Sequence, residues 1–110
     1  MSTICPTSSE TIVSVTFRLK APSSTDRFLT LTAELVAWLQ QRPGFRRYEL
    51  YRSADAWTDT MVWSDSVAAN RGNAAFMLTD LSLKMIALVE LDYRSFIGQR
   101  VSIENQKVTA

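Results

Sequence analysis

The order in which two hydrophobic periodicities follow each other constrains this chain more than any other feature. Residues 11–19 alternate, with Val13, Val15 and Phe17 on one side. A period of two is typical of a strand that buries one face. Residues 28–39 then carry apolar side chains mostly three and four positions apart, which is the spacing of an amphipathic helix. This succession predicts a sheet covered by helices.

The first helix is bounded by residues that cap or stop helices. Ser23, with Asp26 three residues later, has the pattern of a short capping box and predicts the start. The pair Pro43 and Gly44 predicts the end, near Arg42. Trp38 lies on the apolar stripe between these ends, so we expect it in the core.

Two further strands are predicted over residues 45–52 and 57–63. Both runs alternate, and only four residues, 53–56, separate them. A link of this length favours a hairpin. The second and third strands are therefore expected to be neighbours in one antiparallel sheet.

The last third of the chain is predicted to hold a broken helix and a final strand. Residues 64–66 cap an alanine-rich helix, which is interrupted and capped again at residues 79–80 and continues over residues 81–91. We expect a loop over residues 92–98. The β-branched residues Val101 and Ile103 predict the last strand over residues 101–103.

The predicted order is strand, helix, strand, strand, helix, strand. This is the ferredoxin-like α+β pattern, an antiparallel sheet with both helices on one face. A chain of 110 residues has room for one domain, so we expect a single domain over 1–110 with an ordered core at about 11–103.

The face of the sheet without helices is predicted to be apolar. Both alternating sets of the second strand contain large side chains, Phe45 and Tyr51 in one set and Tyr48 and Leu50 in the other. A monomer would expose this surface to water. We therefore expect a homodimer in which two sheets face each other and close a barrel.

Charge and composition argue against several classes of partner. Twelve Lys and Arg residues against eleven Asp and Glu residues leave no basic surface of the kind that nucleic acids require. No apolar stretch approaches the roughly 20 residues that span a bilayer. The first residues lack the pattern of a secretory signal. The single cysteine, Cys5, cannot form an internal disulfide, which favours a cytoplasmic protein with no catalytic thiol.

The chain contains no histidine, and this excludes much of enzyme chemistry. Histidine-activated serine and cysteine nucleophiles are ruled out. A haem held by a proximal histidine and nearly all zinc sites are ruled out as well. There is also no glycine-rich phosphate-binding loop. We expect a protein that works without a metal or a cofactor.

Three segments resemble the antibiotic biosynthesis monooxygenase-like family of the dimeric α+β barrel superfamily. They are Arg42-Pro43-Gly44-Phe45, Tyr48-Glu49-Leu50-Tyr51-Arg52 and Val62-Trp63-Ser64-Asp65. The broken second helix is similar too, and the resemblance covers roughly residues 11–103. It implies the fold and the dimer described above. The family includes cofactor-free oxygenases, haem-degrading enzymes and members without an assigned activity; the haem-degrading branch needs a histidine on the second helix, which is absent here.

The resemblance implies a dry pocket between sheet and helices for an electron-rich aromatic molecule. Trp63 is expected to wall this pocket, with Asn73, Phe76 and Met77 of the second helix around it. The alternative is that Trp63 is a large core residue beneath that helix. A surface position is the alternative for Asn73, as it is for Asn70.

Asp59 and Tyr48 are the catalytic candidates. Asp59 shares a side of its strand with Trp63, so burial would raise its pKa and make it a base. The alternative is a solvated or ion-paired carboxylate at the rim of the barrel. Tyr48 and Tyr51 lie on opposite sides of their strand, so one phenol at most can orient a substrate oxygen on the helix side; the alternative is that it fills space.

Two functions remain open on the sequence. One is a cofactor-free monooxygenase that acts on a small aromatic, polyketide-like or quinol-like molecule. The other is a non-catalytic homodimer of the same fold that binds a small ligand or serves as an accessory protein. The same pocket would serve both.

Overall fold

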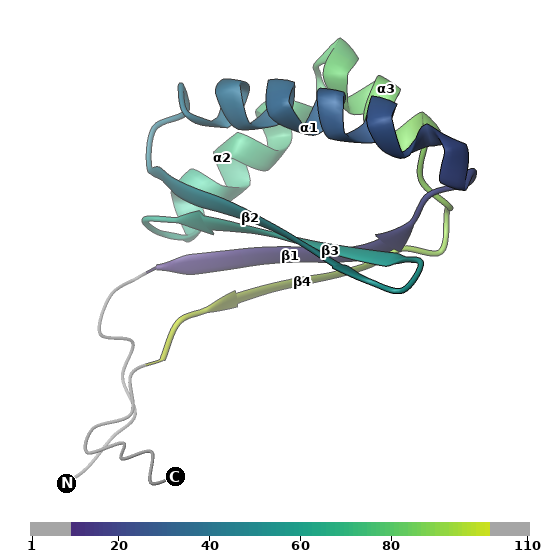
Figure 1. Cartoon of the computed structure of the whole chain (residues 1–110). Helices are drawn as coiled ribbons and strands as arrows, with labels where there is room; N and C mark the ends of the chain where they lie inside the picture. The colour runs from purple at the N-terminus through teal and green to yellow at the C-terminus, as the bar shows by residue number, and fades with distance from the viewer. Residues whose placement is uncertain (1–9, 102–110) are drawn as a thin grey trace, which may run out of the picture.

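Four antiparallel strands form one sheet, and three helices lie over one of its faces (Figure 1). The computed structural model describes residues 10–101. Its elements, in chain order, are β1 (Thr11–Arg18), a 3₁₀ turn (Pro22–Ser24), α1 (Thr25–Leu39), β2 (Phe45–Ser53), β3 (Ala56–Trp63), α2 (Ser66–Met77), α3 (Asp80–Ala87) and β4 (Arg94–Gln99). The ferredoxin-like α+β fold is confirmed, with the second helix in two pieces.

The strand order is β2-β3-β1-β4, so β1 and β3 form the centre of the sheet. Val15 pairs with Asp59 across these two strands, and Thr11 pairs with Gln99 of β4. The register places Trp57, Asp59, Met61 and Trp63 of β3 on the side that faces the helices. Strand alternation then puts the side chains between them on the opposite face.

The core lies between the sheet and α1. Phe28 of α1 packs between Phe17 of β1 and Trp57 of β3, with ring centroids 5.3 and 5.2 Å apart. Burying each of these rings contributes about 1.5–3 kcal/mol, because apolar surface is removed from water. The buried residues of α1 are Phe28, Leu31, Thr32, Leu35 and Leu39.

The start of α1 differs from the prediction. Ser24 is the residue at its N-cap, and its side chain makes no capping hydrogen bond. Pro22 instead opens a 3₁₀ turn, in which the Thr25 hydroxyl donates to the Pro22 carbonyl at 2.8 Å. The expected cap at Ser23 is therefore wrong, because the fixed φ of proline starts a tighter turn one step earlier. Trp38 is half-buried rather than a core residue, and it packs against Phe76.

The last strand also lies elsewhere than predicted. β4 spans Arg94–Gln99, which the sequence suggested as loop, and Val101 lies outside any strand. Residues 102–110 and Cys5 lie outside the described part of the chain. α3 ends at Ala87, four residues before the predicted end. β4 is an edge strand exposed over most of its length, so its pairing with β1, and not a burial pattern, determines its position.

The helix-free face is less apolar than predicted. A β-bulge between Phe45 and Arg47 turns Phe45 to the helix side, where its ring packs edge-on against Trp63 at 5.5 Å. Hydroxyl pairs occupy the centre of the helix-free face: Ser14 with Thr60 at 3.4 Å and Thr16 with Thr58 at 2.9 Å. Its exposed aromatic side chains are Tyr51 and Phe96.

Candidate functional site

Two polar side chains meet on the helix-facing side of the sheet. Tyr48 of β2 and Asp59 of β3 both point to this side, and the Tyr48 hydroxyl donates to Asp59 Oδ2 at 3.0 Å. Asp59 is only 7% exposed. The structure therefore brings the two catalytic candidates into contact, and it shows that Asp59 is not a solvated rim carboxylate. Tyr51 lies on the other face.

Burial raises the pKa of Asp59 from its ordinary value of 3.8 to about 6. The hydrogen bond from Tyr48 and the backbone amide of Val15 act in the opposite direction but do not offset the loss of hydration. The pKa of Tyr48 is raised as well, first by burial and then by the negative charge of Asp59. Tyr48 therefore stays protonated and remains a donor.

The environment of Asp59 differs from that of the other buried acidic residue, Glu10. Arg46 bonds the Glu10 carboxylate at 2.8 Å and Arg100 lies 3.5 Å from it. The hydrogen bond from Arg46 lowers the pKa of Glu10. No arginine or lysine within residues 10–101 forms a salt bridge with Asp59. Glu10 thus ties strands together as a stable anion, whereas Asp59 can gain and lose a proton near neutral pH.

Asp59 has one oxygen available to accept a proton. Oδ2 receives the Tyr48 hydrogen bond, while Oδ1 is buried and has no partner of hydrogen-bonding geometry in the described part of the chain. An unsatisfied buried acceptor is uncommon and is costly in free energy. A carboxylate with a pKa near 6 and a free oxygen in a dry site is suited to act as a general base.

A hollow between the sheet and α2 lies two positions along β3 from Asp59. Its volume is about 20 Å³, close to the space for one water molecule. Trp63, Asn73 and Phe76 line it, as do Met61 and Gly72. Met77 does not; its side chain is 53% exposed. Asp59 and Tyr48 are not among the residues that line this hollow.

Trp63 is packed tightly rather than open to a wide pocket. It is 2% exposed, and a Cβ placed on Gly72 would lie 2.2 Å from its ring. Phe45 packs on it from the side of the sheet. The indole is therefore both a core residue beneath α2 and one wall of a small hollow, and the position of Gly72 allows α2 to approach it.

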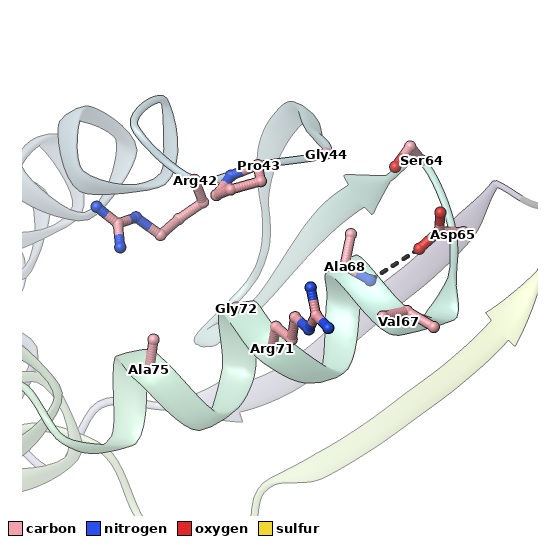
Figure 2. A pocket seen from close by; sticks show the side chains of 10 residues that line it. All are labelled: Arg42, Pro43, Gly44, Ser64, Asp65, Val67, Ala68, Arg71, Gly72 and Ala75. Carbon is pink, nitrogen blue, oxygen red and sulfur yellow. Dashed lines mark hydrogen bonds between the residues drawn. The ribbon is translucent and has the colours of Figure 1, made fainter.

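A larger groove lies on another side of α2, and the sequence did not indicate it. Figure 2 shows the segment Arg42-Pro43-Gly44 above α2, with Arg71 rising between them. The groove has a volume of about 390 Å³. In the sequence, Arg42 and Gly44 indicate only the end of the first helix and part of the segment that resembles the monooxygenase-like family. These residues and Arg71 are far apart in the sequence and line one groove only because α2 packs beside this loop.

The walls of this groove are fixed by short-range contacts. Gly44 has a φ of +81°, a conformation that a side chain would strain, and its carbonyl accepts from the Ser64 amide at 2.7 Å. A Cβ on Gly44 would also lie 2.5 Å from the Cβ of Ala68. Asp65 caps α2 by accepting the Ala68 amide at 2.8 Å (Figure 2). The loop and the first turn of α2 are thus held together.

The described residues offer no cluster for a metal ion. No three acidic or cysteine side chains within residues 10–101 come together in a metal-binding arrangement. No helix in the same part of the chain is long and apolar enough to cross a membrane.

Comparisons with known proteins give similarity in structure but not in sequence. No family model and no curated protein matches the chain. SnoaB, a cofactor-independent oxygenase from Streptomyces nogalater, is similar over 89% of this chain and 99% of its own, with 22% identity and a TM-score of 0.74. The match to an antibiotic biosynthesis monooxygenase covers 84% of this chain and 99% of that protein, with 23% identity and a TM-score of 0.70. The match to a conserved protein from Methanosarcina mazei covers 83% of this chain and 92% of that protein, with 14% identity and a TM-score of 0.72.

The resemblance first seen in the segments around Gly44 and Trp63 is thus confirmed at the level of the backbone. The match covers 89% of this chain and 99% of SnoaB. At sequence identities of 14–23% the similarity establishes the fold and not the reaction. The chain has the ferredoxin-like fold shared by SnoaB and the antibiotic biosynthesis monooxygenases.

Proposed function

We propose that this protein is a cofactor-free monooxygenase for a small aromatic substrate of the polyketide or quinol type. The observation that carries the proposal is the buried Asp59–Tyr48 pair, in which Asp59 has a pKa of about 6 and a free oxygen. The fold shared with a cofactor-independent oxygenase supports it. Asp59 is the proposed base, and Tyr48 is a positioning residue that acts through it.

The reaction fits these groups when an anthrone is taken as the substrate type. Asp59 removes a proton from the activated CH₂ group and leaves a carbanion that the aromatic system delocalises. The carbanion passes an electron to O₂, and the resulting radical pair combines into a peroxide anion, which Asp59 then protonates. Loss of water gives the quinone, so one CH₂ group and one O₂ become one carbonyl and one H₂O. The substrate itself supplies every electron.

Substrate entry requires that α2 move away from the sheet, because the hollow of about 20 Å³ is smaller than an aromatic ring system. α2 is suited to this movement. Its buried residues are only Ala69 and Gly72, so little apolar surface holds it down. Such a displacement would open the space between Trp63 and Asp59, and its return would exclude water from the reaction.

Oxygen consumption with a panel of anthrones and quinols tests the proposal. We expect the wild type to consume O₂ with at least one member, and Asp59→Asn to lower kcat by 10²-fold or more, in the range of a general base, ~10²–10⁴. Asp26→Asn, an exposed residue of α1, is the matched control and should retain the wild-type rate. Uptake that survives in Asp59→Asn would refute the role of Asp59.

A non-catalytic ligand-binding protein is the second candidate. The groove of about 390 Å³ above α2 favours it, because a preformed pocket for a small molecule usually has about 300–1,000 Å³. Binding of an anthrone without any O₂ consumption would establish this alternative and exclude the oxygenase.

We also propose that the protein is a homodimer joined through the helix-free face. The exposed side chains of Tyr51 and Phe96 lie on this face and would be buried by a second sheet. The hydroxyl pairs at its centre are already satisfied by one another, so they can be covered at little cost. A stable interface of this type buries about 800 Å² on each subunit.

A further inference from the structure

The hollow beside Trp63 is small and mostly apolar. Its volume of about 20 Å³ is enough for one small molecule, and a pocket for a drug-sized ligand has roughly 300–1,000 Å³. Residues of β1, α1, β3 and α2 surround it, and most of them are apolar: Val13, Leu35, Leu39, Ala69 and Phe76. The hollow is therefore enclosed by the core of the domain and excludes a ring system as long as α2 stays in place.

The lining of the hollow offers little to a water molecule. A buried water typically makes about three hydrogen bonds to the polar groups around it. The polar side-chain groups of this lining are the Asn73 amide and the indole N–H of Trp63, and the thioether of Met61 accepts only weakly. The backbone groups around the hollow belong to paired strands and to helices, so their hydrogen bonds are already made. Cavities of this kind stay dry and take up apolar molecules such as xenon.

Met61 separates the hollow from the Asp59–Tyr48 pair. It lines the hollow, lies two residues or about 7 Å along β3 from Asp59, and pairs with Tyr48 across the sheet. Methionine is unbranched and has three rotatable bonds, so its side chain can move aside without a change in the backbone. Asn73 lines the hollow as well and is exposed, so the hollow lies close to the molecular surface at this point.

We propose that this hollow holds the O₂ molecule that the monooxygenase reaction consumes. O₂ is apolar and a weak hydrogen-bond acceptor, so the lining favours it over water. It lies on the Trp63 side of Met61 and reaches the carbanion formed at Asp59 when the Met61 side chain moves. O₂ enters past Asn73 while α2 stays over the sheet, whereas the aromatic substrate needs α2 to move. The use of O₂ rests on the proposed function, but its binding in the hollow is measured without turnover.

NMR under O₂ pressure tests the binding directly, because O₂ is paramagnetic and speeds the relaxation of nuclei close to it. Leu35 and Ala69 line the hollow, whereas Leu31 is equally buried and does not. We expect O₂ to raise the relaxation rates of the Leu35 and Ala69 methyl groups at least fivefold more than those of Leu31. Equal effects at the three residues would overturn the proposal. So would an ordered water in the hollow, detected by a nuclear Overhauser effect between water and the Ala69 methyl group.

Val13→Ile adds one methyl group to the wall of the hollow, and Val89→Ile is the matched control. Both valines are half-buried and pack against the core, but Val89 does not line the hollow. Val13→Ile should reduce the excess relaxation at Leu35 and Ala69 by half or more, because the added group takes the space of the O₂ molecule. Val89→Ile should leave it unchanged. No reduction in Val13→Ile, or an equal reduction in both variants, would overturn the site.

Turnover gives the second test. In O₂ uptake with an anthrone, Val13→Ile should raise the KM for O₂ at least threefold and change the KM for the anthrone by less than twofold; Val89→Ile should keep both values. A rise in the KM for the anthrone alone would make Val13 part of the substrate site and overturn the O₂ site. Uptake by a protein whose hollow holds no O₂ would overturn this inference alone. O₂ in the hollow without uptake for any anthrone or quinol would overturn the monooxygenase, and with it the use assigned to the hollow.

Discussion

The carboxyl group of Asp59 is buried, and burial favours its neutral form. The stability of the folded protein therefore depends on pH. Its pKa is about 6 in the folded protein against 3.8 ordinarily, a difference of roughly two units. The folded state therefore binds more protons than the unfolded state between these values, and stability falls as pH rises through them. The ionised group costs roughly 3 kcal/mol above pH 6.

Asp59→Asn should remove this cost. The difference in unfolding free energy between Asp59→Asn and wild type should change with pH. From pH 4 to pH 7.5 we expect it to move by about 2–3 kcal/mol in the direction that stabilises the variant. Urea unfolding of both proteins at several pH values measures the shift. A difference that does not change with pH would show that Asp59 titrates normally.

Tyr48 should tune the pKa of Asp59 through their hydrogen bond. The bond lowers the Asp59 pKa, so Tyr48→Phe should raise it further and move the acid limb of the kcat/KM profile to higher pH. The variant should also lose roughly 1–3 kcal/mol of stability, because a buried acceptor loses its donor. Tyr51→Phe, on the exposed face, is the control, and a profile that is unchanged in both variants would contradict the role of Tyr48.

Strand alternation alone predicts that Asp59 and Trp63 lie on one side of β3. It does not predict which residues of β2 contact them. The Tyr48–Asp59 contact depends on the register of β2 against β3, and a bulge beside Phe45 sets that register. A bulge leaves little trace in a local pattern, since it changes which residues oppose each other and not the residues themselves.

Among the elements, the two pieces of the second helix carry the caps that the sequence predicted. Asp65 accepts the Ala68 amide, and Thr79 accepts the Ser82 amide at 3.1 Å. Asp65→Ala and Thr79→Ala should each cost about 1 kcal/mol of stability. Ser24→Ala, at the N-cap of α1 where no side-chain bond is made, should change stability by less than roughly 0.5 kcal/mol. Thermal unfolding of the three variants measures these differences, and an equal loss in all three would contradict the assignment.

Elements with a buried stripe were predictable, and elements held by pairing alone were not. α1 follows its apolar spacing closely, because that stripe is what the core requires. β4 has few buried side chains, and the amide of Glu90 and the pairing with β1 position it. The groove between residues 42 and 71 belongs to the second group, since it forms from contacts between a loop and a helix far apart in sequence.

For the whole molecule, association is the first property to measure. Two copies of the 12.4 kDa chain should give a particle of about 25 kDa in light scattering at micromolar concentration. Phe96→Asp should shift the protein to the monomer, because it places a charge on the proposed interface. Leu29→Asp, on the exposed side of α1, should leave the dimer intact. A 12 kDa particle for the wild type would exclude the homodimer.

The Trp63 ring occupies the space that a side chain on residue 72 would need. A methyl group on residue 72 would overlap the indole at 2.2 Å, so Gly72→Ala should cost about 1–3 kcal/mol as the indole or α2 is forced aside. Trp63→Phe alone should also destabilise, by leaving a void. Together the two changes should cost less than their sum, which a double-mutant cycle measures. Across chains of this fold, side-chain size at these two sites should therefore vary inversely, a large ring opposite glycine and a smaller one opposite alanine.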